Sequence, residues 1–303
     1  MSVRAIKGFR LYMEDEYFVS DGGRFVAVFD GHGGNGVSRY LRENLYKTLR
    51  YYLYEESEDD YYKKHDANTS NISAVTDPSV NSRYSALSIA HHVSALRSAF
   101  RSVEREVISL ESLQHEGSTA VAVMLHESEN GNRTLISANI GDSRAVLSRR
   151  GRAISLTRDH KPNDEKEKAR IMALGETVEW DSYSGVYRVR NLSLSRAIGD
   201  SYAKPYVSSE VEIKRFPLGE DGADEFIVLA SDGLWDVMES QEVVTYIHHI
   251  LRAPVPLDES AMMTQRTRRR HMPRYLSNEA LRRGSGDNIC IIVVWLDREG
   301  ASQ

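Results

Sequence analysis

Residues 25–34 read F-V-A-V-F-D-G-H-G-G, a short apolar run that ends in a carboxylate and a glycine-rich turn. Five consecutive β-branched, aromatic or small apolar residues are typical of a buried strand. Two other stretches combine the same features. Phe226–Ala230 is followed by Ser231-Asp232-Gly233, and Asp287-Asn288 precede the apolar run Ile289–Leu296. These three stretches predict central strands with a carboxylate at one end of each.

The ends at which these carboxylates lie indicate a common site. Asp30 and Asp232 follow their strands, whereas Asp287 comes before its strand. If the last strand runs antiparallel to the other two, all three carboxylates meet at one edge. A single Asp-Gly pair is more often a plain turn. Three like charges at one edge would repel unless a cation lies among them, and oxygen ligands suit hard divalent ions. The pattern therefore predicts Mg²⁺ or Mn²⁺.

The remaining periodicities predict a mixture of strands and helices. Further strands are expected at 120–125, 135–140 and 145–148. Helices are expected at 37–49, at 87–110, between Asn163 as N-cap and Gly175, and at 240–251 with Ser240 as cap. The alternation is too irregular for a doubly wound sheet, so we expect an α+β fold with stacked sheets and flanking helices.

Two segments are predicted to lie on the surface. Residues 51–84 combine acidic residues with an Asn/Ser/Thr-rich stretch, which indicates a polar loop insertion between two helices. Residues 253–274 contain Pro254, Pro256 and a cluster of arginines, which indicates a second surface excursion. The paired histidines at 91–92 and 248–249 fall on predicted helices, where exposed or core-edge positions are expected.

Composition restricts the class of protein. The 303 residues are 41% hydrophobic and 27% charged with a net charge of −5, which does not favour nucleic-acid binding. The single cysteine, Cys290, excludes an intrachain disulfide and favours a reducing compartment, the cytoplasm or the nucleus. The longest apolar run has only eight residues, so no membrane span is expected.

Two further motifs carry charged residues. At the N-terminus, Arg10 could clamp a phosphate with two parallel donors, while Glu14 and Asp15 could hold metal-bound water. Asp142 lies in Gly141-Asp142-Ser143-Arg144 between two predicted strands, where a hairpin turn is the simpler interpretation.

A competing motif overlaps the first stretch. Gly31, Gly33 and Gly36 match the dinucleotide-binding pattern G-x-G-x-x-G, and Glu55 follows about 20 residues later. Taken alone, this pattern predicts an NAD-binding oxidoreductase. Asp30 would however repel the pyrophosphate, and the acidic segment replaces the second parallel strand that such a fold requires. The NAD-binding interpretation is therefore only a remote alternative.

In their order along the chain, eight motifs resemble those of the metal-dependent serine/threonine protein phosphatases of type 2C. They are Arg10–Asp15, Asp30–Gly34, Gly117–Ala120, Gly141–Arg144, Asp159–Pro162, Ser195–Asp200, Ala230–Val237 and Gly286–Asn288. The resemblance covers nearly the whole chain and implies one catalytic domain over residues 1–303. It also implies a β-sandwich of two mostly antiparallel sheets flanked by helix pairs, an α-β-β-α arrangement.

The resemblance also implies an activity and a set of roles. A hydroxide that bridges two Mg²⁺ or Mn²⁺ ions would attack phosphoserine or phosphothreonine directly in phosphoprotein substrates, and the enzyme would be a monomer. Arg10 would bind the phosphate and His32 would be the general acid. Arg196 and Asp200 would be structural. The resemblance also implies a set of metal-site residues. Asp30 would be the bridging ligand, and the Gly31 carbonyl, Asp232 and Asp287 would be further direct ligands. Coordinated water would be held by Glu14, Asp15 and Asn288, and a third, weaker metal by Asp142 and Asp236.

The chain departs from the family pattern before Ser195. The family commonly has V-N-G-x-L there, whereas residues 188–195 read R-V-R-N-L-S-L-S, which is shorter and lacks the glycine. This departure bears on the shape of the neighbouring flap and on substrate preference. A phosphatase-like pseudoenzyme that serves as a binding module is the main alternative function, but pseudoenzymes typically lose metal carboxylates, and Asp30, Asp232 and Asp287 are present.

Overall fold

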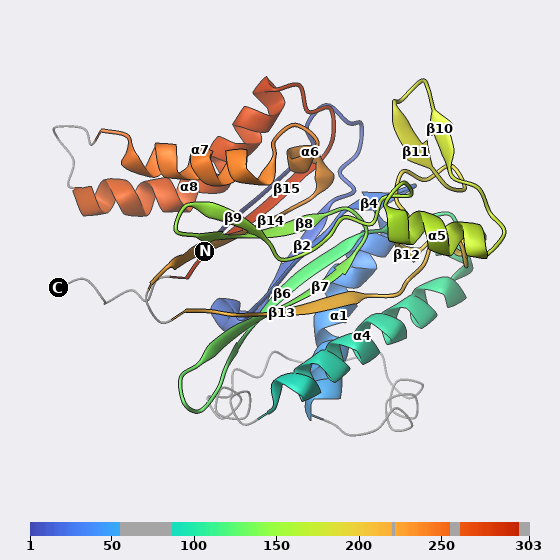
Figure 1. The fold of residues 1–303 in the computed structure, drawn as a ribbon, viewed down its shortest axis with the longest axis horizontal. Helices are drawn as coiled ribbons and strands as arrows, with labels where there is room; N and C mark the ends of the chain where they lie inside the picture. The colour runs from blue at the N-terminus through green and yellow to red at the C-terminus, as the bar shows by residue number, and fades with distance from the viewer. Residues whose placement is uncertain (55–86, 220–221, 255–260, 297–303) are drawn as a thin grey trace.

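The computed structural model describes residues 1–54, 87–219, 222–254 and 261–296. Two five-stranded antiparallel sheets form its centre (Figure 1). The first sheet has the order β1 (Ser2–Ile6), β15 (Ile289–Trp295), β14 (Asp224–Ala230), β8 (Arg144–Arg149) and β9 (Arg152–Ser155). The second has the order β13 (Glu212–Pro217), β7 (Arg133–Ile140), β6 (Ala120–Glu127), β3 (Phe25–Phe29) and β2 (Glu16–Val19).

Helix pairs cover the outer faces of both sheets (Figure 1). Helices α1 (Gly36–Tyr54) and α4 (Ile89–Ser109) pack on the second sheet, and α7 (Ser240–Arg252) and α8 (Ala261–Arg282) pack on the first. The predicted α+β sandwich with an α-β-β-α arrangement is therefore confirmed. Tyr51–Tyr54, the first residues of the expected insertion at 51–84, belong to α1, and residues 55–84 lie outside the described parts of the chain.

Strand β3 shows why the central strands are apolar throughout. Side chains alternate between the two faces of a strand. Val26 and Val28 lie in the core between the sheets, whereas Phe25, Ala27 and Phe29 pack against α1 and α4. Because both faces are buried, the strand has a continuous apolar run instead of an alternating pattern.

Smaller elements lie near one end of the sandwich. A three-stranded sheet joins β12 (Ile198–Gly199), β5 (Gly117–Ser118) and β4 (Gly31–His32), and β10 (Glu179–Asp181) pairs with β11 (Val186–Arg188) in a hairpin. The hairpin lies beside the short helix α5 (Glu165–Ala173), apart from the main layers (Figure 1). The short helix α6 (Asp232–Trp235) follows β14, and three 3₁₀ turns complete the elements: η1 (Asp21–Gly23), η2 (Glu111–Leu113) and η3 (Ser201–Ala203).

The expected surface excursion at 253–274 is wrong, because α8 occupies most of that segment. The apolar face of α8 continues past it, with Met272, Leu276 and Ala280 buried against the first sheet. Pro273 lacks an N–H and so cannot bond to the carbonyl of residue 269. The hydroxyl of Ser2 donates to that Arg269 carbonyl at 2.9 Å. A hydrogen bond from the N-terminal strand thus satisfies the carbonyl that Pro273 leaves without its usual helical partner.

Two helix starts differ from the prediction by one residue. Asp164, not Asn163, caps α5, and its carboxylate accepts from the backbone N–H groups of Lys166 and Glu167. Glu239, not Ser240, begins α7 through reciprocal bonds with Glu242. In both places the neighbouring carboxylate is the side chain that reaches the free N–H groups of the first turn.

The paired histidines take structural positions, as expected. His92 is buried and bonds to the Ser88 carbonyl, and burial lowers its pKa to about 4. His248 contacts Glu225 at 3.1 Å, and His249 is exposed on α7. None of the four lines the candidate site described below.

A buried carboxylate fixes α5 to the loop before β12. Glu167 is 1% exposed, and its Oε1 accepts from the guanidinium of Arg196, whereas its Oε2 accepts from Arg170 and from the hydroxyl of Ser195. Burial alone would raise the pKa of Glu167, but the arginines lower it to about 2. The expectation that Arg196 is structural agrees with this contact.

We expect Glu167→Gln to lower the free energy of unfolding by about 3–5 kcal/mol, because it leaves buried guanidinium charge without its partner. The folded-state pKa lies below the ordinary value of 4.5. The stabilisation is therefore complete above pH 4.5 and is lost as the pH falls towards 2. Urea unfolding at pH 7 and at acidic pH measures both effects. Glu165→Gln, an exposed position on the same helix, is the control, and an equal loss in the two variants would contradict the assignment.

Candidate active site

The predicted convergence of carboxylates is confirmed by the strand directions. β15 pairs antiparallel with β14, with Ala230 opposite Ile291. Asp232, just after β14, therefore lies beside the start of β15, which Asp287 precedes. A Cβ at Gly233 would overlap the backbone carbonyl of Asn288, so only glycine permits this approach. Asp30 reaches the same place from the end of β3 in the other sheet.

A hollow of about 220 Å³ lies at this edge of the sandwich. It brings together most of the residues that the sequence analysis proposed for the site. Eight of them line it: Arg10, Glu14, Asp30, Gly31, His32, Asp142, Asp232 and Asp287. Residues of the segment 188–194 close another side of the hollow.

The carboxylates of the hollow repel one another in a poorly hydrated place. Burial raises the pKa of Asp30 and of Asp232 well above the ordinary value. The Asp30 carboxylate raises the pKa of Asp232 further, and Asp15, Asp142 and Asp287 raise that of Asp30. Asp15 is buried behind them and bonds to the Ser231 hydroxyl, and burial raises its pKa to about 7. Together these charges create a strong attraction for a cation.

Two basic side chains of the protein itself already contact this cluster. Arg10 donates to Asp287 at 2.6 Å. Lys161 is bonded to Asp142. Burial alone would lower the pKa of Lys161, but Asp142 raises it above the ordinary value, and Asp232 and Asp236 add to the increase. Each ion pair offsets one of the negative charges.

The chemistry of the donor atoms fits a hard divalent cation. One hollow is lined by several carboxylate residues and by Gly31, and neither cysteine nor methionine is among its lining residues. In the part of the chain that the structure describes, no three Asp, Glu, His or Cys side chains stand close enough to form a ready ligand set. The fit of this site to a divalent cation therefore rests on the type of its donor atoms and on their common location. Arg10 and Lys161 each bind one of the carboxylates.

Three proposed site residues do not line the hollow. Asp15 is buried and lies outside the lining. Asp236 caps the end of α6 with part of its surface exposed, and partial desolvation of its carboxylate and nearby acids raise its pKa although Lys161 opposes them. Asn288 uses its side-chain amide to fix the N-terminal segment. Its Oδ1 accepts from the Glu14 N–H at 2.7 Å, and its Nδ2 donates to the carbonyls of Lys7 and Tyr12. Asn288 thus positions Glu14.

His32 has a buried partner that sequence reasoning missed. Its Nε2 lies 2.7 Å from Oδ2 of Asp200, whose side chain is fully buried. Asp200 had been expected to be structural only. A Cβ at Gly117 would overlap both His32 and Asp200, so this glycine lets the two side chains meet. The order of motifs along the chain could not reveal the contact, because 168 residues separate the partners.

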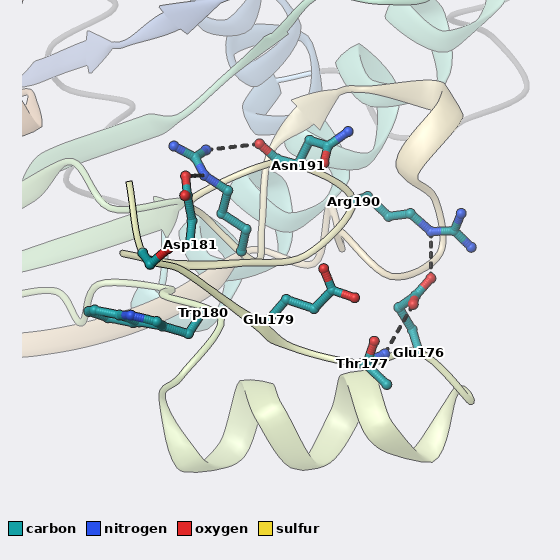
Figure 2. Close-up of a pocket in the computed structure, with 9 residues that line it drawn as sticks. Glu176, Thr177, Glu179, Trp180, Asp181, Arg190 and Asn191 are labelled. Atoms are coloured by element: carbon teal, nitrogen blue, oxygen red, sulfur yellow. Dashed lines mark hydrogen bonds and ion pairs between the residues drawn. The ribbon is translucent and has the colours of Figure 1, made fainter. Parts of the chain in front are cut away.

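A second, larger hollow of about 740 Å³ adjoins the first and shares Arg188 and Asn191 with it. Figure 2 shows Glu179 of β10 between Asp181 and Arg190. Arg190 and Asn191 have φ values of 50° and 68°, and Val189 and Leu192 on either side exchange two hydrogen bonds. The segment is therefore a two-residue hairpin turn without glycine.

Two contacts hold this turn in place. Arg190 contacts Glu176 at 2.6 Å, and its guanidinium lies 4.6 Å from the ring centre of Tyr206. A positive φ is unfavourable for arginine, so these contacts stabilise a backbone shape that its sequence opposes. The segment that departs from the V-N-G-x-L pattern thus forms a tight turn from two non-glycine residues.

The dinucleotide-binding interpretation is contradicted by the fold. All pairs of named strands are antiparallel in the described residues, whereas that fold needs parallel strands around its glycine turn. The space beside Gly34 and Gly36 is filled by Glu116, which accepts from the Gly36 N–H at 2.6 Å. No room remains there for a pyrophosphate.

Comparisons with known proteins agree with this geometry. The sequence profile described as "Protein phosphatase 2C" matches residues 1–289. Two relatives from Arabidopsis thaliana are "Probable protein phosphatase 2C 11", 36% identical over 96% of this chain and 64% of the relative, and "Probable protein phosphatase 2C 59", 35% identical over 95% of this chain and 76% of the relative. The chain spans only part of the length of these curated relatives, and for a relative from Oryza sativa, "Probable protein phosphatase 2C 52", it spans 49%.

Solved structures share the fold. A sex-determining protein of C. elegans matches 98% of this chain and 64% of its own, with a TM-score of 0.72 and 24% identity. A serine-threonine phosphatase 2C from Toxoplasma gondii matches 97% of this chain and 93% of its own, with a TM-score of 0.68 and 22% identity.

The carboxylate cluster leads to a prediction about thermal stability. Asp232→Asn removes one repelling charge, so we expect the metal-free protein to melt higher, by roughly 2–4 °C for each kcal/mol of repulsion relieved. The same change should abolish the increase in melting temperature that Mn²⁺ produces in the parent protein. Melting curves with EDTA and with Mn²⁺ measure both, and the exposed Asp21→Asn is the control. An unchanged Mn²⁺ response in Asp232→Asn would contradict a cation site here.

Proposed function

The chain belongs to the protein phosphatase 2C family, and from this membership we propose that it hydrolyses phosphoserine and phosphothreonine in proteins with the help of two divalent ions, Mg²⁺ or Mn²⁺. The observation that supports the activity most directly is the hollow in which Asp30, Asp232 and Asp287 lie beside Arg10 and His32. A pseudoenzyme that only binds phosphoproteins would not need this set of groups.

The residues around the hollow divide into two groups by charge. The carboxylates would hold the cations, with Asp30 between them, the Gly31 carbonyl, Asp232 and Asp287 as further ligands, and Glu14 and Asp15 ordering coordinated water. Asp142 and Asp236 would serve a third, weaker ion. When bound, the ions would supply a water nucleophile that is active near neutral pH and would neutralise phosphoryl charge.

Arg10 would bind the nonbridging oxygens of the phosphoryl group. Its side chain is 54% exposed at the mouth of the hollow, and the bond to Asp287 directs the guanidinium inward. A guanidinium presents two parallel donors, which match two oxygens of a phosphate. Arg10 would thus orient the phosphoryl group for attack from the side of the carboxylates.

His32 would give a proton to the leaving alkoxide. A buried carboxylate only accepts hydrogen bonds, so Nε2 of His32 carries the hydrogen that faces Asp200. Nδ1 is then the nitrogen that remains for transfer to substrate. Asp200 acts through His32 and is a positioning residue. Serine and threonine alkoxides leave poorly without a proton, so this step should affect the rate.

We propose a location in the cytoplasm or the nucleus from the state of the single cysteine. The single thiol, Cys290, is buried and free, which is compatible with a reducing compartment, the cytoplasm or the nucleus. Among the helices of the described residues, none combines the length and the apolar character needed to cross a bilayer.

Metal dependence is the first test of the activity. Phosphate release from a phosphothreonine peptide should stop in EDTA and return with excess Mn²⁺ or Mg²⁺, because the cluster needs a cation to bind the phosphoryl group. Full turnover after exhaustive chelation would contradict the proposed mechanism. Metal binding without any turnover would favour the pseudoenzyme.

The roles of Arg10 and His32 can be separated with two substrates. p-Nitrophenolate leaves well without a proton, so His32→Gln should slow phosphopeptide hydrolysis by about 10²–10⁴-fold and p-nitrophenyl phosphate hydrolysis far less. Asp200→Asn should change the same ratio in the same direction, but by less. Arg10→Ala should impair both substrates alike, since the nonbridging oxygens are common to them. An equal effect of His32→Gln on both substrates would exclude the general-acid role.

A further inference from the structure

Helix α8 (Ala261–Arg282) carries an excess of positive charge in an acidic protein. It has six arginines and one acidic residue, Glu279, so its formal charge is +5, whereas the whole chain is at −5. Three of the arginines have structural partners. They are Arg268, which donates to the carbonyls of Leu251, Ala253 and Pro254, Arg269, whose guanidinium lies 4.9 Å from the ring centre of Trp295, and Arg282, which pairs with Glu279.

The other three arginines form one exposed row. Arg266, Arg270 and Arg274 are four residues apart, so they lie on one face of the helix, opposite the buried Met272 and Leu276. All three are exposed, and within the described residues none of their guanidinium groups has a hydrogen bond or ion pair. We call these three residues the α8 basic stripe.

The stripe contributes nothing visible to folding. Like charges four residues apart on a helix destabilise it. The helix is already fixed by its apolar face and by the structural arginines. The three positive charges of the stripe therefore add mutual repulsion and form no ion pair with the described residues that would offset it. An anion from outside the described residues would relieve this repulsion.

The surroundings of the stripe select the kind of anion. A membrane-surface helix needs an exposed apolar face, but Met272, Leu276 and Ala280 of α8 are buried, and the exposed residues beside the stripe include Thr267, His271 and Asn278. A nucleic acid would be repelled by the rest of the protein, which carries a formal charge of −10. A short acidic protein segment can bind to the stripe alone, without contacting the negatively charged remainder of the protein.

The stripe also leads to the catalytic edge. Figure 1 shows α8 over the first sheet, and its C-terminal end leads into the loop that carries Asp287 and then into β15. Arg274 and Arg266 lie about 12 and 24 Å along the helix from Arg282. An extended peptide covers about 3.3 Å per residue, so these helix distances correspond to roughly 4 to 7 residues. The stretch from Arg282 to the hollow adds up to about five more, so roughly 4 to 12 residues would connect a phosphoresidue in the hollow to the stripe.

From this placement we propose that the α8 basic stripe binds an acidic segment of the phosphoprotein substrate, roughly 4 to 12 residues away from the phosphoserine or phosphothreonine. The proposal rests on the proposed phosphatase activity. The segment would hold the substrate through ion pairs with the arginines while the phosphoryl group lies in the hollow. Ion pairs at an exposed surface weaken with salt, so the docking should be strongest at low ionic strength.

The test uses phosphothreonine peptides with a Gly/Ser linker of about eight residues and a glutamate-rich tail, compared with the same peptides in which the tail is glutamine. We expect the acidic tail to raise kcat/KM about tenfold at low salt, through KM, and we expect R266Q/R270Q/R274Q to lose this gain. The matched control is R97Q/R101Q/R105Q, the same spacing on exposed positions of α4. p-Nitrophenyl phosphate turnover should stay unchanged in both variants.

The controls decide how the result is interpreted. Retention of the gain in R266Q/R270Q/R274Q, or an equal loss in the α4 variant, would overturn the proposal. An optimum at a linker of about two residues would contradict the placement along α8. Tighter binding of duplex DNA or of phosphatidylserine vesicles than of the acidic tail, lost in the α8 variant, would assign the stripe to another partner.

A binding measurement separates this proposal from the phosphatase activity. Fluorescence anisotropy of the labelled glutamate-rich peptide without phosphate requires no turnover. If that peptide binds the parent protein and not R266Q/R270Q/R274Q while no phosphopeptide is hydrolysed, the stripe is confirmed as an acidic-segment site and the proposed activity fails. If hydrolysis is normal but neither peptide binding nor a tail effect is seen, the activity stands and the stripe proposal is wrong.

Discussion

Mutual repulsion among carboxylates at one edge of the sandwich is the constraint around which the rest of the structure is arranged. Asp30 and Asp232 lie at the ends of strands from different sheets, where burial and proximity raise the pKa of each. A cluster of this kind destabilises a folded chain unless something positive balances it. Arg10 pairs with Asp287 and Lys161 pairs with Asp142, and the chemistry of the remaining donors fits divalent cations.

Two buried carboxylates outside this cluster, Glu167 and Asp200, have a cationic or an imidazole partner and hold distant segments together. Glu167 joins α5 to Arg196 in the loop before β12, and Asp200 at the end of the same segment holds His32. Because Arg196 and Asp200 lie four residues apart around β12, the two contacts fix both ends of that short strand. The position of the imidazole therefore depends on packing that begins at a helix remote from it in sequence.

Several features could be predicted from the sequence because they depend on local rules. Continuous apolar runs identified β3, β14 and β15 as strands buried on both faces, and the side on which each aspartate falls predicted their convergence. The prediction failed for α8, where Pro254, Pro256 and a cluster of arginines indicated a surface excursion. There the Ser2 hydroxyl, contributed by β1, satisfies the carbonyl that Pro273 leaves free, and no local pattern could have indicated it.

What the sequence alone determined was the type of each central element, the family, and which residue types would meet at the catalytic edge, since these follow from periodicity and from ordered motifs. Only the tertiary structure decided the pairs that are distant along the chain. It joined His32 to Asp200, assigned Asn288 to the N-terminal segment, and separated the arginines of α8 into structural and unpartnered ones. The physical reason is that such contacts depend on which surfaces the packed sheets and helices bring within a few ångströms, and sequence spacing carries no record of that distance.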